Sequence, residues 1–182
     1  VNEIINEVGL PCFVKPNAEG SSFGVTKVKE AAQLEDALKK AFALCREVLI
    51  ETFIDGTELT CGVVKAGDMD ITMPIAEVVP KNEFFDFEAK YDPTKSDEII
   101  PARISPELTN RIKILSSMIY DILRCEGIIR VDYIVREDEI FMLEVNTTPG
   151  MTSNSFVPKM VRAMGGTLRE VLTKIIDNKL NR

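Results

Sequence analysis

Hydrophobic and polar residues alternate along two segments in the last third of the chain, 128–135 and 141–146. Side chains alternate between the two faces of a strand, so this pattern predicts two strands, each with one apolar face. The linker 136–139 is short and polar, and it predicts that the two strands form a hairpin. The expected apolar faces consist of Val131, Tyr133 and Val135 in the first strand and Phe141, Leu143 and Val145 in the second.

The opposite face of this hairpin carries polar side chains. Arg130 and Asp132 share it on the first strand, and Glu144 and Asn146 share it, beside Met142, on the second. Because carboxylate and carboxamide oxygens suit a hard divalent cation, the group predicts a site for Mg²⁺ and a nucleotide. An ordinary half-solvated hairpin with a plain salt bridge to Arg130 is the alternative interpretation.

The same reading along the rest of the chain predicts an α+β fold. Apolar residues at helical spacing indicate an amphipathic helix at 30–44, and Ser105 followed by Pro106 is typical of a helix start. Residues 81–102 show no clear period and predict a long loop. The other expected helices cover 1–8, 105–126, 157–164 and 167–180, and the other expected strands cover 11–15, 25–28, 48–53, 58–65 and 75–79.

Composition narrows the chemistry. The 182 residues contain no histidine, which excludes a Ser-His-Asp triad and any imidazole metal site. A net charge of -7 argues against a nucleic-acid-binding surface. No apolar run has the length of a membrane span, so we expect a cytoplasmic protein without a membrane partner. The four cysteines form no Cys-x-x-Cys pair, and we interpret them as reduced, mostly buried packing residues.

Five motifs in order along nearly the whole chain resemble the D-alanine–D-alanine ligases of the ATP-grasp superfamily. They are Phe13-Val14-Lys15-Pro16, the loop Glu19-Gly20-Ser21-Ser22-Phe23-Gly24, Glu88-Ala89-Lys90-Tyr91, Arg130-Val131-Asp132, and the segment from Glu144 to Thr152. The resemblance covers the ATP-grasp portion alone. The family's amino-terminal domain has no counterpart here, so we interpret the chain as a fragment and expect it not to join D-alanines at a useful rate by itself.

The resemblance implies two lobes with mainly antiparallel sheets and ATP between them. Residues 1–53 would belong to the central lobe, and 54–182 to the C-terminal lobe, with a mobile lid at about 81–102. It implies ATP with two Mg²⁺ or Mn²⁺ ions, D-alanine as substrate for peptidoglycan precursors, and a homodimer in the full-length protein.

The resemblance also assigns residues to the nucleotide. Lys15 and the loop residue Ser22 would contact the phosphates, and Lys90 would close over the γ-phosphate. Glu51 would lie at the adenine edge, and Glu58 would accept hydrogen bonds from the ribose hydroxyls. For Lys15 the alternative is a surface lysine, and for both glutamates it is an exposed strand carboxylate.

For the reaction itself, the resemblance assigns Arg130 to the transferring phosphoryl group and the Gly150 N–H to the oxyanion. Ser21 and Tyr91 would belong to a network that orients substrate. Ser155 and the Phe156 N–H would bind the carboxylate of the second D-alanine; for Ser155 a plain N-cap is the compatible alternative. In the same family pattern the two metal ions are held by Asp132, Glu144 and Asn146, with Glu144 bridging.

Three other functions remain open at this point. One is another ATP-grasp carboxylate–amine ligase, including a depsipeptide ligase; the motif at 88–91 resembles the D-alanine-specific type instead. Another is a non-catalytic nucleotide-binding module. The third is a two-metal phosphohydrolase, which would release phosphate from ATP without an amine.

Overall fold

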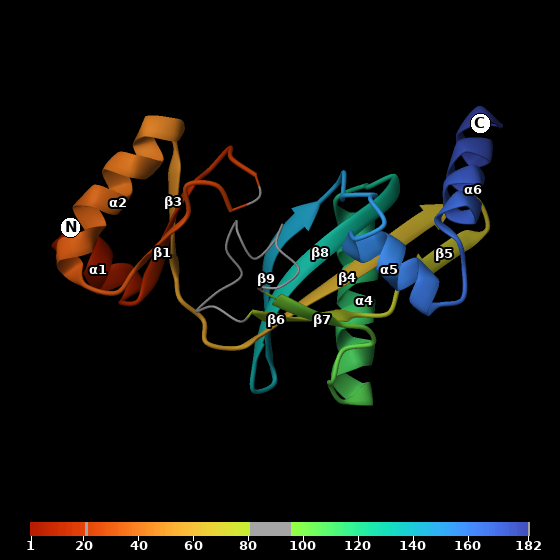
Figure 1. Ribbon diagram of the computed structural model, residues 1–182, viewed down its shortest axis with the longest axis horizontal. Coiled ribbons are helices and arrows are strands. Elements are labelled where there is room, and N and C mark those ends of the chain that lie inside the picture. Colours follow the sequence, from red (N-terminus) through yellow and green to blue (C-terminus); the bar gives the residue numbers. More distant parts are fainter. Residues whose placement is uncertain (21, 81–95, 182) are drawn as a thin grey trace. The chain divides into compact units, whose positions relative to one another are not determined.

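The computed structural model describes residues 1–20, 22–80 and 96–181 (Figure 1). Two compact units account for them. Unit 1 contains the residues up to Asp55 together with Pro80 and Ser96, which are the terminal residues of two strands of the unit 2 sheet, and unit 2 contains Gly56–Val79 and the chain from Asp97 onward. Both units combine helices with sheets, and the α+β class expected from the sequence is confirmed.

Unit 1 is a three-stranded sheet with a helix on one face. Its elements are α1 (Asn2–Val8), β1 (Cys12–Pro16), β2 (Thr26–Val28), α2 (Ala31–Leu44) and β3 (Val48–Thr52). The sheet has the order β2-β1-β3, and both pairings are antiparallel. Leu34, Ala37 and Ala41 of α2 are buried with Val14 and Val28 of the sheet. This packing leaves the other face of the sheet for polar residues.

Unit 2 is built on a six-stranded sheet. Its strands are β4 (Thr57–Ala66), β5 (Met69–Thr72), β6 (Ala76–Pro80), β7 (Ser96–Ile99), β8 (Gly127–Arg136) and β9 (Glu139–Asn146). Its helices are α4 (Pro106–Ile122), α5 (Phe156–Ala163) and α6 (Leu168–Leu180). The strand order is β7-β6-β4-β8-β9, with β5 also paired to β4. The predicted hairpin is confirmed, because β8 and β9 pair antiparallel.

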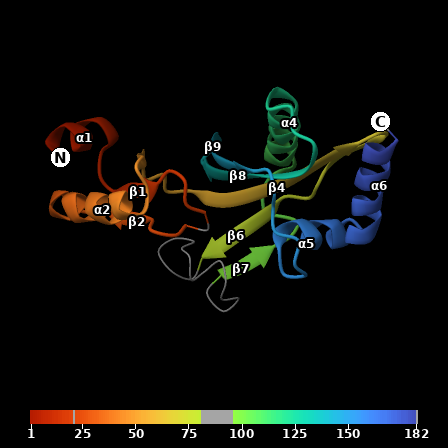
Figure 2. The same ribbon diagram turned by 90° about the horizontal axis from the view of Figure 1, so that it is seen from above.

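Different helices cover the two faces of this sheet. On one face α4 packs on alternate residues of β4 and β8, among them Cys61, Val131 and Tyr133. On the other face α5 and α6 pack on Val64 and Ile128 (Figure 2). The second face therefore has a helix-covered apolar end, and the polar residues of β8 lie farther along it.

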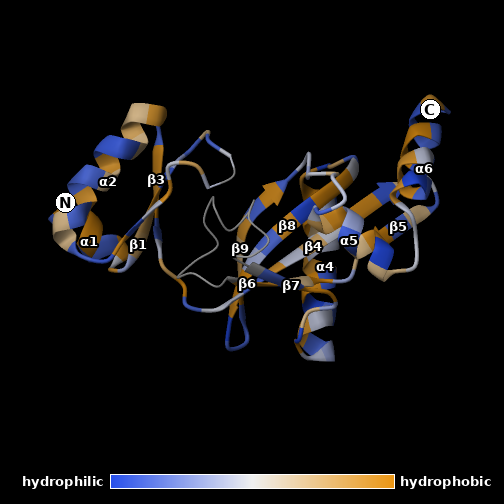
Figure 3. Cartoon of the chain, viewed as in Figure 1, coloured by the Kyte–Doolittle hydropathy of each residue, from blue (hydrophilic) through white to orange (hydrophobic). Residues whose placement is uncertain are grey.

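Local signals explain where the helices begin. The side chain of Ser105 caps α4 by accepting a hydrogen bond from the Leu108 N–H, as the sequence predicts. Thr167 and Glu170 form a capping box at the start of α6. Hydrophobic and hydrophilic residues occur in alternate bands along α2 and α6, as expected for helices with one packed face (Figure 3). Among the described residues no helix is both long and apolar enough to cross a membrane.

Two strands were not predicted. β5 is a short strand that follows a turn, and β7 lies inside the segment 81–102 that was predicted to be a loop. The sequence of β7, Ser-Asp-Glu-Ile, is short and mostly polar, as edge strands often are, and such a strand has no apolar alternation to reveal it. Residues 81–95, which carry most of the expected lid, lie outside the described residues.

Three apolar residues depart from the predicted faces. Helical spacing in the sequence places Phe42 with the apolar residues of α2 and Ile122 with those of α4, but they are 55% and 73% exposed, and Ile122 is the last residue of its helix. In β9 a register shift opposite Asp132 and Tyr133 breaks the alternation. As a result Ile140 and Val145, and not Phe141, pack against the core on the α4 side.

A buried carboxylate anchors the segment that leads into α4. Glu77 of β6 is 6% exposed and accepts hydrogen bonds from the Arg103 backbone N–H at 3.0 Å, from its Nε at 3.0 Å and from its Nη2 at 2.6 Å. The hydrogen bonds from Arg103 lower the pKa of Glu77, and they outweigh the effect of burial, which raises it. A carboxylate in this position needs its partner in order to remain charged.

We predict that Arg103→Met lowers the free energy of unfolding by about 1–3 kcal/mol, because it leaves the buried Glu77 carboxylate without the side-chain hydrogen bonds from Arg103. The pKa of Glu77 is lower in the folded state, so its contribution is full above the unfolded pKa and is lost as the pH falls through the folded pKa. Urea unfolding at pH 7 and at pH 4 measures both effects, and the acid-dependent loss should be smaller in the variant. Arg136→Met is the control, because Arg136 pairs with the exposed Glu139. Equal losses in the two variants would contradict the prediction.

Candidate functional site

The polar face of the hairpin brings together the four side chains that the sequence placed there. In the β8–β9 register, Arg130 stands opposite Asn146, and Asp132 stands opposite Glu144. The register shift follows immediately after Asp132. Bulges of this kind commonly re-aim side chains next to functional sites.

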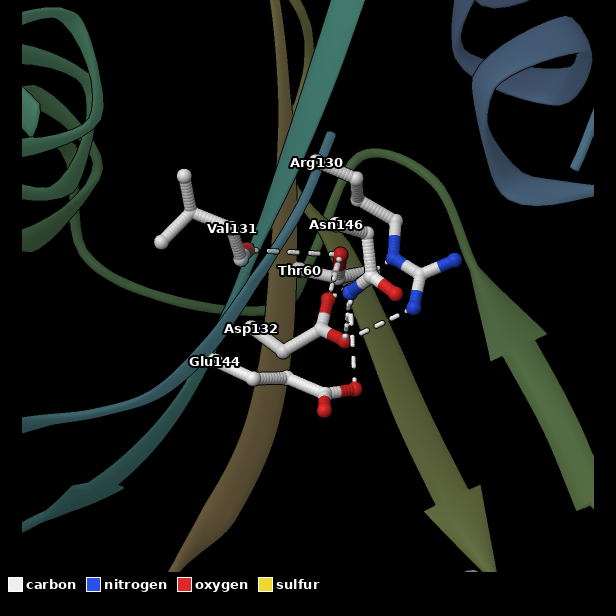
Figure 4. A network of polar contacts seen from close by, with 6 residues as sticks. All are labelled: Thr60, Arg130, Val131, Asp132, Glu144 and Asn146. Carbon is white, nitrogen blue, oxygen red and sulfur yellow. Dashed lines mark hydrogen bonds and ion pairs between the residues drawn. The ribbon is translucent and has the colours of Figure 1, made fainter. Parts of the chain in front are cut away.

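Asp132 is the centre of this group. Its Oδ1 accepts hydrogen bonds from Thr60 Oγ1 at 2.5 Å and from Arg130 Nε at 2.8 Å (Figure 4). Its Oδ2 accepts from Arg130 Nη2 at 2.7 Å and from Asn146 Nδ2 at 3.0 Å. Asp132 is only 9% exposed, so these donors replace the water that a carboxylate would otherwise bind.

Arg130 is held on two sides. Besides its bidentate contact with Asp132, its guanidinium carbon lies 5.4 Å from the centre of the Phe156 ring at the start of α5. Burial opposes the charge of Arg130, but the hydrogen bonds to Asp132 and the charges of Asp132, Glu144 and Glu58 outweigh it and raise the pKa of Arg130. The guanidinium therefore stays charged, and three carboxylates act on it.

Asn146 connects the two carboxylates of the hairpin. Its Nδ2 donates to Asp132 Oδ2 at 3.0 Å and to Glu144 Oε1 at 3.4 Å. Among the described residues no group of three or more His, Cys, Asp or Glu side chains is arranged to hold a metal. Two carboxylates and one carboxamide nevertheless fit Mg²⁺, which keeps several water or phosphate oxygens in its coordination shell. The Asn146 amide already donates to one oxygen of Asp132 and one of Glu144. A bound cation would place positive charge near the same two oxygens.

The loop between β9 and α5 holds Ser155 in an unusual way for an N-cap residue. Its side chain makes no capping hydrogen bond, and its Oγ lies 2.9 Å from Thr152 Oγ1. A Cβ on Gly150 would lie 2.8 Å from the same Oγ, so glycine allows this approach without a shift of the Ser155 hydroxyl. Gly150 and Ser155 are therefore brought together, and the Ser155 hydroxyl is not used to cap α5.

Unit 1 carries a second polar group on the sheet face away from α2. Phe13 stands opposite both Lys27 and Glu51, so all three share this face. Lys15 forms an ion pair with Glu51. Lys27 Nζ lies 3.6 Å from the centre of the Phe53 ring, and the Phe13 and Phe53 rings meet edge to face at 5.9 Å. The face combines aromatic surface with ammonium groups.

The remaining predicted residues are Ser22, Glu58 and three residues that the structure does not describe. Ser22 lies in the loop before β2 with a positive φ of 58°, and its carbonyl accepts from the Val25 N–H at 3.3 Å. Glu58 lies on β4 in unit 2 and acts on Arg130 through its charge. Ser21, Lys90 and Tyr91 lie outside the described residues, so their assignments stay predictions.

Sequence reasoning missed Thr60 and Lys27. Thr60 is 2% exposed and stands opposite Asp132 in the β4–β8 register. Alternation along β4 places Glu58 and Thr60 on one face, which is the only signal for Thr60 in the sequence. The sequence correctly predicted the strand that carries Lys27. The contact between Lys27 and Phe53 could not be predicted, because it depends on the pairing of β1 with both β2 and β3.

Comparisons with known proteins agree with this fold. Residues 1–177 match the family described as D-ala D-ala ligase C-terminus. The chain is 57% identical to a D-alanine–D-alanine ligase from Bacteroides fragilis over 178 residues, which cover 97% of this chain and 55% of that protein. A D-alanine–D-alanine ligase from Porphyromonas gingivalis is 52% identical over 182 residues, which cover 100% of this chain and 55% of that protein. The chain thus spans about half the length of the curated relatives it matches.

Solved structures extend the comparison. The D-alanine–D-alanine ligase from Bacillus anthracis complexed with ATP is 33% identical, with a TM-score of 0.80 over 100% of this chain and 57% of that chain. The VanG D-Ala:D-Ser ligase from Enterococcus faecalis is 38% identical, with a TM-score of 0.82 over 97% of this chain and 51% of that chain. Both likenesses extend over nearly all of the sequence.

The contact between Arg130 and Asp132 generates a prediction about cations. Arg130 donates to both oxygens of Asp132, and its positive charge repels an added cation. We therefore expect Arg130→Met to raise the affinity for Mn²⁺ about fivefold, equivalent to about 1 kcal/mol of Coulomb repulsion removed. Electron paramagnetic resonance of free and bound Mn²⁺ measures it, with Arg136→Met as the control at the exposed end of β8. Weaker binding in Arg130→Met would show that Arg130 organises the carboxylates more than it competes with the cation.

Proposed function

The chain belongs to the D-ala D-ala ligase C-terminus family, and we propose that it supplies the ATP-binding and catalytic part of a ligase that joins two D-alanines for peptidoglycan precursors. Relatives at 52–58% identity over nearly the whole chain support this substrate. The likeness to a ligase structure complexed with ATP supports the nucleotide.

The proposed reaction has two steps. The carboxylate of the first D-alanine attacks the γ-phosphorus of ATP, which gives an acyl phosphate and ADP. The amine of the second D-alanine then attacks the acyl carbon, and inorganic phosphate leaves with the bonding electron pair as the amide forms. Activation is required because a free carboxylate is a poor acyl donor. We assign most of the catalysis to position and charge.

Unit 2 supplies the groups that we assign to the reacting atoms. Arg130 stabilises negative charge on the transferring phosphoryl group, and its raised pKa keeps it cationic throughout. The Gly150 N–H donates to the oxyanion that forms at the acyl carbon. Ser155 and the Phe156 N–H bind the carboxylate of the second D-alanine at the start of α5, where backbone N–H groups favour an anion.

Asp132, Glu144 and Asn146 are the residues that we assign to Mg²⁺ or Mn²⁺. A bound cation would neutralise phosphate charge and orient the phosphoryl group. The chain's own contribution is to hold the Asp132 carboxylate in place by four hydrogen bonds. Glu144 is the more exposed of the two carboxylates, and we assign it to bridge two ions.

We assign the nucleotide's other contacts as the family pattern suggests. Lys15 and Ser22 serve the phosphates, Glu51 the adenine edge and Glu58 the ribose. Lys15 also forms an ion pair with Glu51, so the two residues assigned to the phosphates and to the adenine edge are in contact. We further propose that the intact protein works in the cytoplasm, where ATP is available, as a homodimer.

One observation carries the proposal. A cationic Arg130 and two carboxylates joined by Asn146 lie side by side on a rigid sheet, and α5 begins next to them. Phosphoryl transfer needs such a pairing of a fixed cation with metal-binding oxygens. A non-catalytic nucleotide-binding module would not need Arg130 held in this position.

D-serine is the second candidate for the amine that accepts the acyl group. The chain is at least as similar to the D-Ala:D-Ser ligase structure as to the D-alanine–D-alanine ligase structure complexed with ATP. Global similarity to these structures therefore does not determine the second substrate. Phosphate release by the intact protein with ATP, Mg²⁺ and D-alanine, alone and with D-serine or D-lactate, tests the function, and mass spectrometry identifies the product. ATP hydrolysis independent of any amino acid would support a phosphohydrolase instead.

We predict that Glu144→Gln weakens binding of Mg-ATP by the intact protein at least tenfold and leaves ATP binding in EDTA nearly unchanged. The substitution removes one charge from the proposed cation site while keeping the shape of the side chain. Calorimetric titration with and without Mg²⁺ measures the difference. Glu139→Gln on the same strand is the matched control, since Glu139 pairs with Arg136 away from the site. Unchanged Mg-ATP affinity in Glu144→Gln would remove Glu144 from the metal site.

A further inference from the structure

Thr60 on β4 stands opposite Asp132 on β8 in the unit 2 sheet, and the two side chains point toward each other (Figure 4). It is 2% exposed, and it has no contact with solvent that could explain a polar side chain at this position. Its Oγ1 lies 2.5 Å from Asp132 Oδ1 and 3.4 Å from the Val131 carbonyl oxygen. The hydroxyl has one proton, and the shorter contact to a charged acceptor is the stronger hydrogen bond.

We propose that Thr60 is a positioning residue for the metal site: its hydroxyl fixes the Asp132 carboxylate so that Oδ2 faces Asn146 and Glu144. This inference depends on the proposed function, because it concerns the same cation. It adds a residue that the five sequence motifs do not contain.

The geometry of the carboxylate supports this role. Oδ1 is held by Thr60 and by Arg130 Nε, whereas Oδ2 is the oxygen that shares the Asn146 amide with Glu144. The two oxygens of Asp132 are therefore not equivalent. Arg130 contacts both of them, and Asn146 contacts only Oδ2. Thr60 on β4 donates only to Oδ1 and Asn146 on β9 donates only to Oδ2, so donors from the two neighbouring strands distinguish the oxygens.

A hydroxyl with a purely structural role would have different consequences. The Val131 carbonyl could accept its proton, and the loss of the hydroxyl would then affect folding without affecting the site. A positioning role instead predicts that cation affinity depends on the hydroxyl at constant stability. Valine has nearly the same shape as threonine and lacks the donor, and serine keeps the donor, so the two substitutions separate these roles.

The experiment compares wild type, Thr60→Val and Thr60→Ser in the intact protein. Binding of Mn²⁺ in the presence of adenylyl imidodiphosphate is followed by electron paramagnetic resonance, and thermal unfolding is followed in EDTA without nucleotide. We expect Thr60→Val to weaken Mn²⁺ binding about tenfold and Thr60→Ser to remain within about twofold of wild type. Thr72→Val, in β5 of the same sheet, is the matched control and should bind as wild type does.

The outcomes separate the two hypotheses. If wild type binds Mn²⁺ with the nucleotide analogue and Thr60→Val binds it equally well, the role of Thr60 is overturned and the proposed function stands. If Thr60→Val loses thermal stability alone, the hydroxyl is structural. If wild type does not bind, the proposed function fails, and the inference fails with it. Should Thr60→Val not fold, Thr60→Ala replaces it, with the same expected loss relative to Thr60→Ser.

Discussion

The bidentate ion pair between Arg130 and Asp132 is the interaction on which the polar face of unit 2 depends. Both side chains are mostly buried, at 16% and 13% exposure, and a buried charge without a partner is strongly unfavourable. The residues lie two positions apart on one strand, so strand geometry alone brings them to the same face. The pair lets this face remain charged and ordered in the absence of a ligand. Thr60, Asn146 and Phe156 then take their positions around it.

In the unit 2 sheet, one face is packed throughout and the other carries the polar residues of the candidate site. The face under α4 is continuously apolar, with Leu59, Cys61, Val131 and Tyr133 fully buried. The opposite face is apolar only where α5 and α6 cover it. Past the part that α5 and α6 cover, β4 and β8 carry Thr60, Arg130 and Asp132, among other residues, on this face. A rigid strand therefore holds each polar side chain, and its neighbours on the reverse face supply the packing that keeps the strand in place.

The sequence predicted the features that depend on local pattern. Alternation placed Arg130 and Asp132 on one face, and the short linker predicted the hairpin that brings Glu144 and Asn146 beside them. The start of α4 at Ser105 followed from capping chemistry. Features that depend on distant pairing were not predictable: Thr60 and Asp132 are 72 positions apart, and only the strand register makes them neighbours. The polar edge strand β7 and the bulge in β9 were missed for a related reason, because tertiary pairing and not local hydrophobicity determines them.

The close approach of Gly150 to Ser155 has an evolutionary consequence. A Cβ at position 150 would lie 2.8 Å from the Ser155 Oγ, so a larger residue there would require the Ser155 hydroxyl to shift. Under the proposed roles, one position donates to the reaction's oxyanion and the other binds the acceptor's carboxylate. Selection for a different second substrate that acts on one of these two positions would therefore also affect the proposed role of the other. A substitution at position 150 would therefore also change the position of the hydroxyl at residue 155, so the two roles are coupled through this one side chain.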